Sequence, residues 1–212
     1  MEVNFWHERW KTNDIGFHQL EVNTLLVKYF KTLSITENGR VFLPLCGKSL
    51  DIAWLLSEGY RVAGAELSQV AIDQLFVELG IVPEITKVGE LTLYSAFNID
   101  IFVGNLFSLS SEMLGAVDAI YDRAALVALP EEVRNKYTDH LTEVTNKAPQ
   151  LLLSYEYDQS LMAGPPFSIS VEEVNRHYAT KYNLTLVESV DVPGGVKGKC
   201  AAVEHVWSLQ IS

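Results

Sequence analysis

The chain has 212 residues, of which 48% are hydrophobic and 20% are charged, a balance that is typical of a globular protein and excludes a disordered chain. Its formal net charge of −11 disfavours nucleic acids and anionic membrane surfaces as partners, because both repel an acidic protein. Its two cysteines are too few for a disulfide framework or a structural zinc site, so no metal site is predicted.

The sequence shows neither a signal peptide nor an apolar stretch of membrane-spanning length, and we therefore expect a cytoplasmic protein. No repeat or flexible linker divides it, so residues 1–212 are predicted to form one domain. The first 35 residues carry an aromatic cluster of Trp6, Trp10 and Phe17, followed by a helix that Asn23 is expected to cap. We interpret residues 1–35 as a helical, aromatic flap that would exclude water and pack on a heterocycle or a sulfonium.

The next segment has the order strand, turn, helix, strand and acid. Residues 40–45 predict a buried strand, Gly47 permits a tight turn, and Ser49 is placed to cap a helix. A second strand is predicted over residues 60–65 and is followed directly by Glu66. This order is half of a mononucleotide-binding βαβ unit, in which the acid accepts hydrogen bonds from a ribose diol. The sequence therefore predicts a cofactor that contains a nucleoside.

Two phosphate-binding motifs are missing from this segment. Lys48 and Ser49 resemble the end of a P-loop, but position 43 is leucine where that motif requires glycine. The G-x-G-x-x-G fingerprint is also absent, which counts against the alternative of a nicotinamide-dependent oxidoreductase that uses Glu66 on a ribose. A second alternative is a non-catalytic module that binds the cofactor without turnover.

The later elements continue the alternation of strands and helices. Residues 91–97 and 101–103 predict either a hairpin or two successive strands. Helices are predicted over 69–79, after Pro130 and after Ser170, which opens a capping box with Glu173; strands are predicted over 117–121, 151–155, 184–192 and 201–209. The last two strands lack an intervening helix and should form an antiparallel pair. The remainder predicts an α/β fold with a mostly parallel sheet covered by helices on both faces.

In such a sheet, ligands bind beyond the carboxyl ends of the strands. Polar or turn residues follow the predicted strands at this edge: 45–48, Glu66, the region of Asn105, Asp122 with Arg123, and 155–158. Asp122 and Arg123 have two interpretations, a structural salt bridge or a ligand-binding pair, and their place after a strand favours the second.

Several motifs spread along the chain match one family. They read F-W-H-E-R-W, I-G-F-H, V-F-L-P-L-C-G-K-S-L-D, Y-D-R-A-A-L-V-A-L and G-P-P-F. With them the chain resembles the thiopurine S-methyltransferases of bacterial type. The resemblance implies a Rossmann-like class I methyltransferase fold with a seven-stranded sheet. It also implies transfer of a methyl group from S-adenosyl-L-methionine to the sulfur of an aromatic or heterocyclic thiol such as 6-mercaptopurine, leaving S-adenosyl-L-homocysteine. Selenium and tellurium compounds are further candidate acceptors.

The resemblance also implies roles for individual residues. The expected cofactor contacts are Trp10, Leu45, Glu66, Asn105, Leu106 and Arg123, and the expected substrate contacts are Phe17, Pro166 and Phe167. Asp14 and His18 are the only candidates for a proton relay, and no catalytic base is assigned. Mammalian relatives carry an arginine in the late loop, where this chain offers only Lys197 and Lys199. The expected partner is a small-molecule thiol, and the expected state is a monomer.

Overall fold

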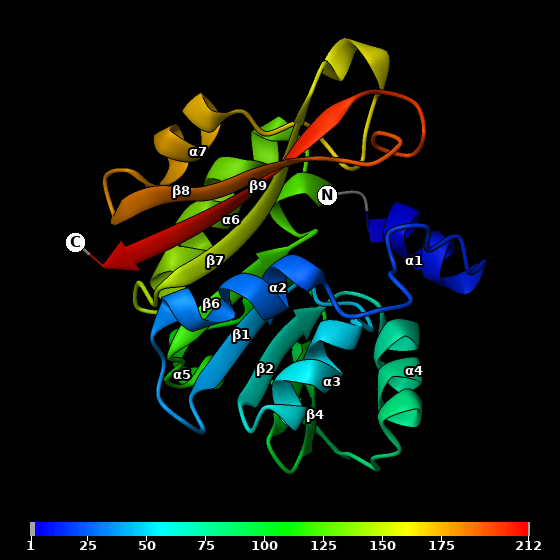
Figure 1. Ribbon diagram of the computed structural model, residues 1–212. Coiled ribbons are helices and arrows are strands. Elements are labelled where there is room, and N and C mark those ends of the chain that lie inside the picture. Colours follow the sequence, from blue (N-terminus) through cyan, green and yellow to red (C-terminus); the bar gives the residue numbers. More distant parts are fainter. Residues whose placement is uncertain (1–2, 212) are drawn as a thin grey trace.

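The computed structural model describes residues 3–211 and shows one nine-stranded sheet with helices on both faces (Figure 1). The strands are β1 (Arg40–Pro44), β2 (Arg61–Glu66), β3 (Glu84–Val88), β4 (Leu91–Ala96), β5 (Ile99–Val103), β6 (Ala119–Arg123), β7 (Gln150–Tyr157), β8 (Tyr182–Asp191) and β9 (Ala202–Ile211). They are ordered β3-β4-β5-β2-β1-β6-β7-β9-β8 across the sheet.

The five central strands, from β5 to β7, are parallel to one another. The two C-terminal strands β8 and β9 form the predicted antiparallel pair, and β9 lies between β7 and β8. The prediction of seven strands is too low by two, because β3 and β4 extend the sheet beyond β5 through antiparallel pairing. Strands β4 and β5 form a hairpin with a two-residue turn at Phe97 and Asn98, which decides between the two predicted arrangements.

The structure describes seven α-helices among residues 3–211, three of which begin at side-chain caps that the sequence predicted. The helices are α1 (Val3–Lys11), α2 (Thr24–Tyr29), α3 (Leu50–Ser57), α4 (Gln69–Leu79), α5 (Ser111–Leu114), α6 (Glu131–Val144) and α7 (Val171–Tyr178). Asn23 accepts hydrogen bonds from the first turn of α2, and Ser49 and Ser170 cap α3 and α7 in the same way. None of the helices among residues 3–211 combines the length and apolar character needed to cross a membrane.

Two hydrophobic cores lie on opposite faces of the sheet, because successive strand residues point to opposite sides. Phe42 and Leu152 pack with α6 and α7, whereas Leu43 and Leu153 pack with α2, α3 and α4. In Figure 1, α2 and α3 lie in front of the sheet and α6 lies behind it. The two layers hold the central strands rigidly, so the carboxyl ends of β1, β2, β6 and β7 form a fixed platform.

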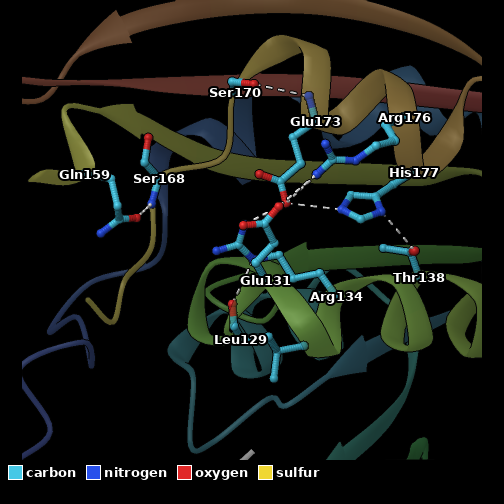
Figure 2. A network of polar contacts seen from close by, with 10 residues as sticks. All are labelled: Leu129, Glu131, Arg134, Thr138, Gln159, Ser168, Ser170, Glu173, Arg176 and His177. Atoms are coloured by element: carbon cyan, nitrogen blue, oxygen red, sulfur yellow. Dashed lines mark hydrogen bonds and ion pairs between the residues drawn. The ribbon is translucent and has the colours of Figure 1, made fainter. Parts of the chain in front are cut away.

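A buried polar network joins α6 to α7 (Figure 2). The Arg134 guanidinium lies 2.6 Å from Oε1 of Glu173, and the same oxygen lies 3.2 Å from Nε2 of His177. Nε of Arg134 also donates to the carbonyl of Leu129. Burial alone would raise the pKa of Glu173, but the hydrogen bonds from His177 and Arg134 outweigh it and lower that pKa. The carboxylate of Glu173 is therefore held in its ionised form between the two helices.

Candidate active site

A cavity of about 280 Å³ opens at the carboxyl ends of β1, β2, β6 and β7. Strand order reverses between β1 and β6. On one side of β1 the sheet continues with β2 and β5, and on the other side it continues with β6 and β7. Ligands of doubly wound sheets bind at such a switch point. Trp10, Phe17, His18, Leu45, Glu66, Arg123 and Pro166, all named from the sequence, line this cavity.

Glu66 is the last residue of β2 and is 6% exposed. Its two carboxylate oxygens accept hydrogen bonds from the backbone N–H groups of Gly47, at 2.9 Å, and Ser68, at 2.8 Å. Burial raises the pKa of Glu66, while these N–H groups act in the opposite direction. A carboxylate has about four acceptor positions, so two remain free after the backbone bonds. Glu66 is thus fixed in place and still able to accept two hydroxyl groups.

Two non-glycine residues in the left-handed backbone region lie at the carboxyl ends of neighbouring strands. Leu45, after β1, has φ of 48°, and Ala124, after β6, has φ of 61°. Both line the cavity. A side chain in this region costs on the order of 1–2 kcal/mol, and such strain clusters where the backbone must face a ligand. The turns after β1 and β6 are therefore the parts of the platform that point backbone groups at a bound molecule.

The aromatic flap closes the cavity over Gly47. Trp10 is 4% exposed, and a Cβ atom on Gly47 would lie 2.9 Å from its ring. Phe17 packs edge-on against Trp10 and Trp6, with ring centroids 5.5 and 5.7 Å apart. Only glycine permits this close contact at a turn with φ of +52°. The indole of Trp10 therefore forms a lid above the turn that follows β1.

Arg123 projects into the cavity from the end of β6. Its guanidinium lies 3.6 Å from the carboxylate of Asp51, which also accepts hydrogen bonds from the Tyr121 hydroxyl and from the backbone N–H of Asn23. Nε of Arg123 is buried and has no hydrogen-bond partner within residues 3–211. A buried donor left unpaired is costly. Arg123 nevertheless lines the cavity with a side chain that is 12% exposed, so the accessible part of its guanidinium can meet an anionic or polar ligand group.

Asp122 points to the opposite face of the sheet, so the two residues do not act as a pair. Asp122 and Arg123 were predicted to follow a strand, but they are the last two residues of β6. Successive strand residues point to opposite faces, so their side chains lie on different sides of the sheet. The carboxylate of Asp122 accepts from the Tyr137 hydroxyl at 2.6 Å and from the backbone of Leu126 at 3.1 Å. Burial raises its pKa to about 6. The interpretation as a ligand-binding pair is therefore correct in placing Arg123 at the cavity and wrong for Asp122, which is structural.

Replacing Asp122 with asparagine is expected to change the pH dependence of stability. The pKa of Asp122 rises from its ordinary 3.8 to about 6 on folding, so between these values the folded chain binds more protons than the unfolded one. The wild-type free energy of unfolding should consequently fall, relative to that of Asp122→Asn, as pH rises from about 4 to about 6. Each pKa unit corresponds to about 1.4 kcal/mol, so the complete shift is worth roughly 3 kcal/mol, of which about 2 kcal/mol falls between pH 4.5 and pH 7. Urea denaturation at pH 4.5, 5.5 and 7 measures it, and parallel curves for the two proteins would contradict the assignment.

Four of the named residues lie outside the lining of this cavity. Asp14 is exposed and forms a 2.8 Å ion pair with Arg9. Asn105 is exposed and caps a short 3-10 helix (Leu106–Ser108) that buries Leu106. Phe167 packs its ring against the guanidinium of Arg134 instead of facing the cavity, and the ring centroid lies 5.4 Å from Cζ of Arg134.

His18, the other relay candidate, does line the cavity. Burial and the positive charges of Lys48 and Arg123 lower its pKa, while Glu78 acts against them. Its imidazole is therefore held in the neutral form at neutral pH, the form that can accept a proton. Within residues 3–211, no group of three or more metal-ligating side chains lies together.

Glu204 of β9 joins the lining without having been named as a contact, and so do three residues of the preceding loop, Val192, Gly195 and Val196. Glu204 carries no local motif; it reaches the cavity because β9 pairs with β7, the last of the parallel strands. Lys197 also lines the cavity, and its Nζ donates to the carbonyl of Pro165 at 2.7 Å. This bond ties the late loop to the loop after β7.

The fold is shared with solved S-adenosylmethionine-dependent methyltransferases. One is 1,6-didemethyltoxoflavin-N1-methyltransferase from Burkholderia thailandensis, solved with bound 1,6-didemethyltoxoflavin and S-adenosylhomocysteine; it superposes with a TM-score of 0.66 at 14% identity, over 99% of this chain and 87% of that one. A TehB-like methyltransferase from Corynebacterium glutamicum gives 0.58 at 11% identity, over 99% and 98%. The chain thus has the Rossmann-like fold of these class I methyltransferases.

Comparison of sequences defines the particular family. The model of the thiopurine S-methyltransferase family matches residues 1–210. The chain is 54% identical to the thiopurine S-methyltransferase of Xanthobacter autotrophicus, over 99% of both sequences. It is 52% identical to that of Teredinibacter turnerae, over 99% of this chain and 97% of the other. The chain belongs to the thiopurine S-methyltransferase family, as its motifs predicted.

Proposed function

We propose that this protein transfers the methyl group of S-adenosylmethionine to the sulfur of an aromatic or heterocyclic thiol such as 6-mercaptopurine. The observation that carries the proposal is the cavity at the switch point of the sheet, which is lined by the fixed carboxylate of Glu66 and by Arg123 under an aromatic lid. Family membership supports sulfur as the accepting atom. The net charge of −11 favours a small acceptor over a nucleic acid or an anionic membrane surface.

The residues present fit S-adenosylmethionine. The two free acceptor positions of Glu66 suit a ribose diol, and the absence of a glycine-rich loop suits a cofactor without pyrophosphate. We assign the backbone after Leu45 and the guanidinium of Arg123 to the methionine end, and Trp10 to the cover above it. When bound, the cofactor supplies a methyl group on a positively charged sulfonium, which is open to direct displacement by a soft sulfur nucleophile.

The protein's own contribution is alignment and exclusion of water. The platform of strand ends fixes one reactant, and the wall formed by Phe17 and Pro166 confines the other. Trp10 and Phe17, packed edge-on, shield the reacting atoms from solvent. A strong base is unnecessary for the fraction of thiol that is already ionised near neutral pH.

Two measurements test the proposal. Isothermal titration calorimetry should show binding of S-adenosylhomocysteine, and radiolabelled S-adenosylmethionine should transfer its methyl group to 6-mercaptopurine. A parallel fluorescence titration with NADH should show no binding. This result would separate a methyltransferase from a nicotinamide-dependent oxidoreductase. Failure to bind S-adenosylhomocysteine would overturn the proposal. Binding without methylation of any thiol, selenium or tellurium acceptor would favour a cofactor-binding module.

A further inference from the structure

Three polar side chains line the part of the cavity that Glu66 does not serve. They are Arg123 at the end of β6, Tyr155 near the end of β7 and Glu204 near the start of β9. Tyr155 and Glu204 are directly opposite one another in the antiparallel β7·β9 pair. Opposed residues of this kind point to the same face with their Cβ atoms about 5 Å apart. The pair is therefore a built-in polar feature of the cavity wall.

Arg123 shares this face of the sheet. It pairs in register with Leu153, two residues before Tyr155 on β7, so the side chains of all three strands point the same way. Leu153 and Val206 continue the same face into the hydrophobic core next to α2, α3 and α4. The polar groups thus stand at the open end of an otherwise apolar surface.

The charge state of the pair follows from its surroundings. Burial raises the pKa of Glu204, and the hydrogen bond from Tyr155 and the charge of Arg123 oppose this without cancelling it. Burial, together with Glu204, raises the pKa of Tyr155 well above its ordinary value. Tyr155 therefore keeps its proton, and its hydroxyl, which lines the cavity beside the cross-strand Glu204, is placed to donate to that carboxylate. A carboxylate with one donor retains further acceptor positions.

We propose that Glu204, oriented by Tyr155, binds the ring N–H adjacent to the sulfur of a heterocyclic thione and accepts its proton during methyl transfer. The inference rests on the proposed function and extends it by defining the substrate class, a neutral thione that carries an N–H next to its C=S carbon. It also adds Glu204 as a catalytic residue and Tyr155 as a positioning residue.

The step balances without a further reactant. The thione sulfur forms a bond to the methyl carbon as the bond between that carbon and the sulfonium breaks, which leaves neutral S-adenosylhomocysteine. The acceptor becomes an S-methyl cation, and its N–H bond electrons return to the ring when the proton moves to Glu204. The products are a neutral S-methyl heterocycle and a protonated carboxyl, which then releases its proton to solvent. General-base assistance of this kind contributes about 10²–10⁴-fold.

The test compares two acceptors in two variants. 6-Mercaptopurine carries ring N–H groups, whereas an electron-poor thiophenol is ionised at pH 8 and has none. Glu204→Gln should lower kcat/KM for 6-mercaptopurine by about 100-fold and change that for the thiophenol less than threefold. Glu156→Gln is the matched control, because Glu156 is the neighbour of Tyr155 on β7 but faces the other side of the sheet and contacts His205. Glu156→Gln should leave kcat/KM unchanged for both acceptors.

Each outcome decides the inference. A selective loss of 6-mercaptopurine methylation, with unchanged affinity for S-adenosylhomocysteine, supports it. Equal loss of both activities, or no loss of either, overturns it and assigns Glu204 to packing. Tyr155→Phe should produce a smaller loss, about tenfold, confined to 6-mercaptopurine. If the wild-type protein methylates neither acceptor, the proposed function itself has failed, which is a separate result.

Discussion

Glu66→Ala is expected to weaken binding of S-adenosylhomocysteine by about 1.5–3 kcal/mol, or roughly 10- to 150-fold in Kd. The variant removes the carboxylate that we assign to the ribose hydroxyls. It also removes the acceptor for the backbone N–H groups of Gly47 and Ser68, which hold the turn after β1 and the start of α4. Titration calorimetry measures the effect directly. Both losses act in the same direction, because the cofactor meets a missing contact and a less ordered turn.

Two further variants separate these contributions. Glu66→Gln keeps one oxygen acceptor and should give an intermediate affinity. Glu84→Ala removes a carboxylate from the exposed edge strand β3 and should bind as the wild-type protein does. An unchanged affinity in a folded Glu66→Ala protein would remove the ribose assignment, and far-ultraviolet circular dichroism establishes that the protein is folded.

Arg134→Met is expected to lower the free energy of unfolding by about 3–5 kcal/mol, because it leaves the buried carboxylate of Glu173 without its closest cation. The side chains of Arg134 and Glu173 are 5% and 12% exposed, and they join α6 to α7 (Figure 2). Arg134 also supports the ring of Phe167, whose backbone N–H donates to the carbonyl of Val127 at the cavity wall. Urea denaturation at pH 7 measures the loss, and the loop that carries Pro166 should become more susceptible to proteolysis.

Arg176 provides the control, since it approaches the same carboxylate at 3.8 Å from a side chain that is 57% exposed. Arg176→Met should cost less than about 1 kcal/mol. The double variant Arg134→Met/Glu173→Leu should recover most of the stability, because an apolar pair replaces a buried ion pair at little cost. Equal effects of the two arginine variants would contradict the view that burial decides the strength of this network.

The sequence was most informative where local chemistry decides the structure. Asn23, Ser49 and Ser170 cap their helices as predicted, because a side-chain oxygen next to free N–H groups has few other choices. The capping box is only half formed. Ser170 accepts from the N–H of Glu173, but the carboxylate of Glu173 turns to Arg134 and His177 instead. The tertiary ion pair replaces the capping interaction of the Glu173 side chain, and no sequence pattern near residue 173 predicts that ion pair.

Long-range pairing explains the parts that could not be predicted. Strand β3 has no buried residue, so it lacks the apolar signal of a strand and was missed. The apolar run before Asp122 suggested that the strand had ended, yet pairing with β7 extends it through Arg123. For the site, Leu45 and Glu66 follow from the order of elements, whereas Glu204 enters the cavity only through the β7·β9 register.

The insertion of β9 between β7 and β8 sets an order for assembly during synthesis. Strand β8 is made first, yet in the sheet it pairs with β9 alone, so it has no template until β9 has left the ribosome. Strand β1, which Leu45 follows, and the strands that carry Glu66 and Arg123 precede both and can pair as the chain emerges. The half of the cavity assigned to the cofactor can therefore form on the nascent chain. The wall that bears Glu204 is completed only once β9 has emerged and paired with β7, which ties the readiness of the acceptor site to a later folding step than that of the cofactor half.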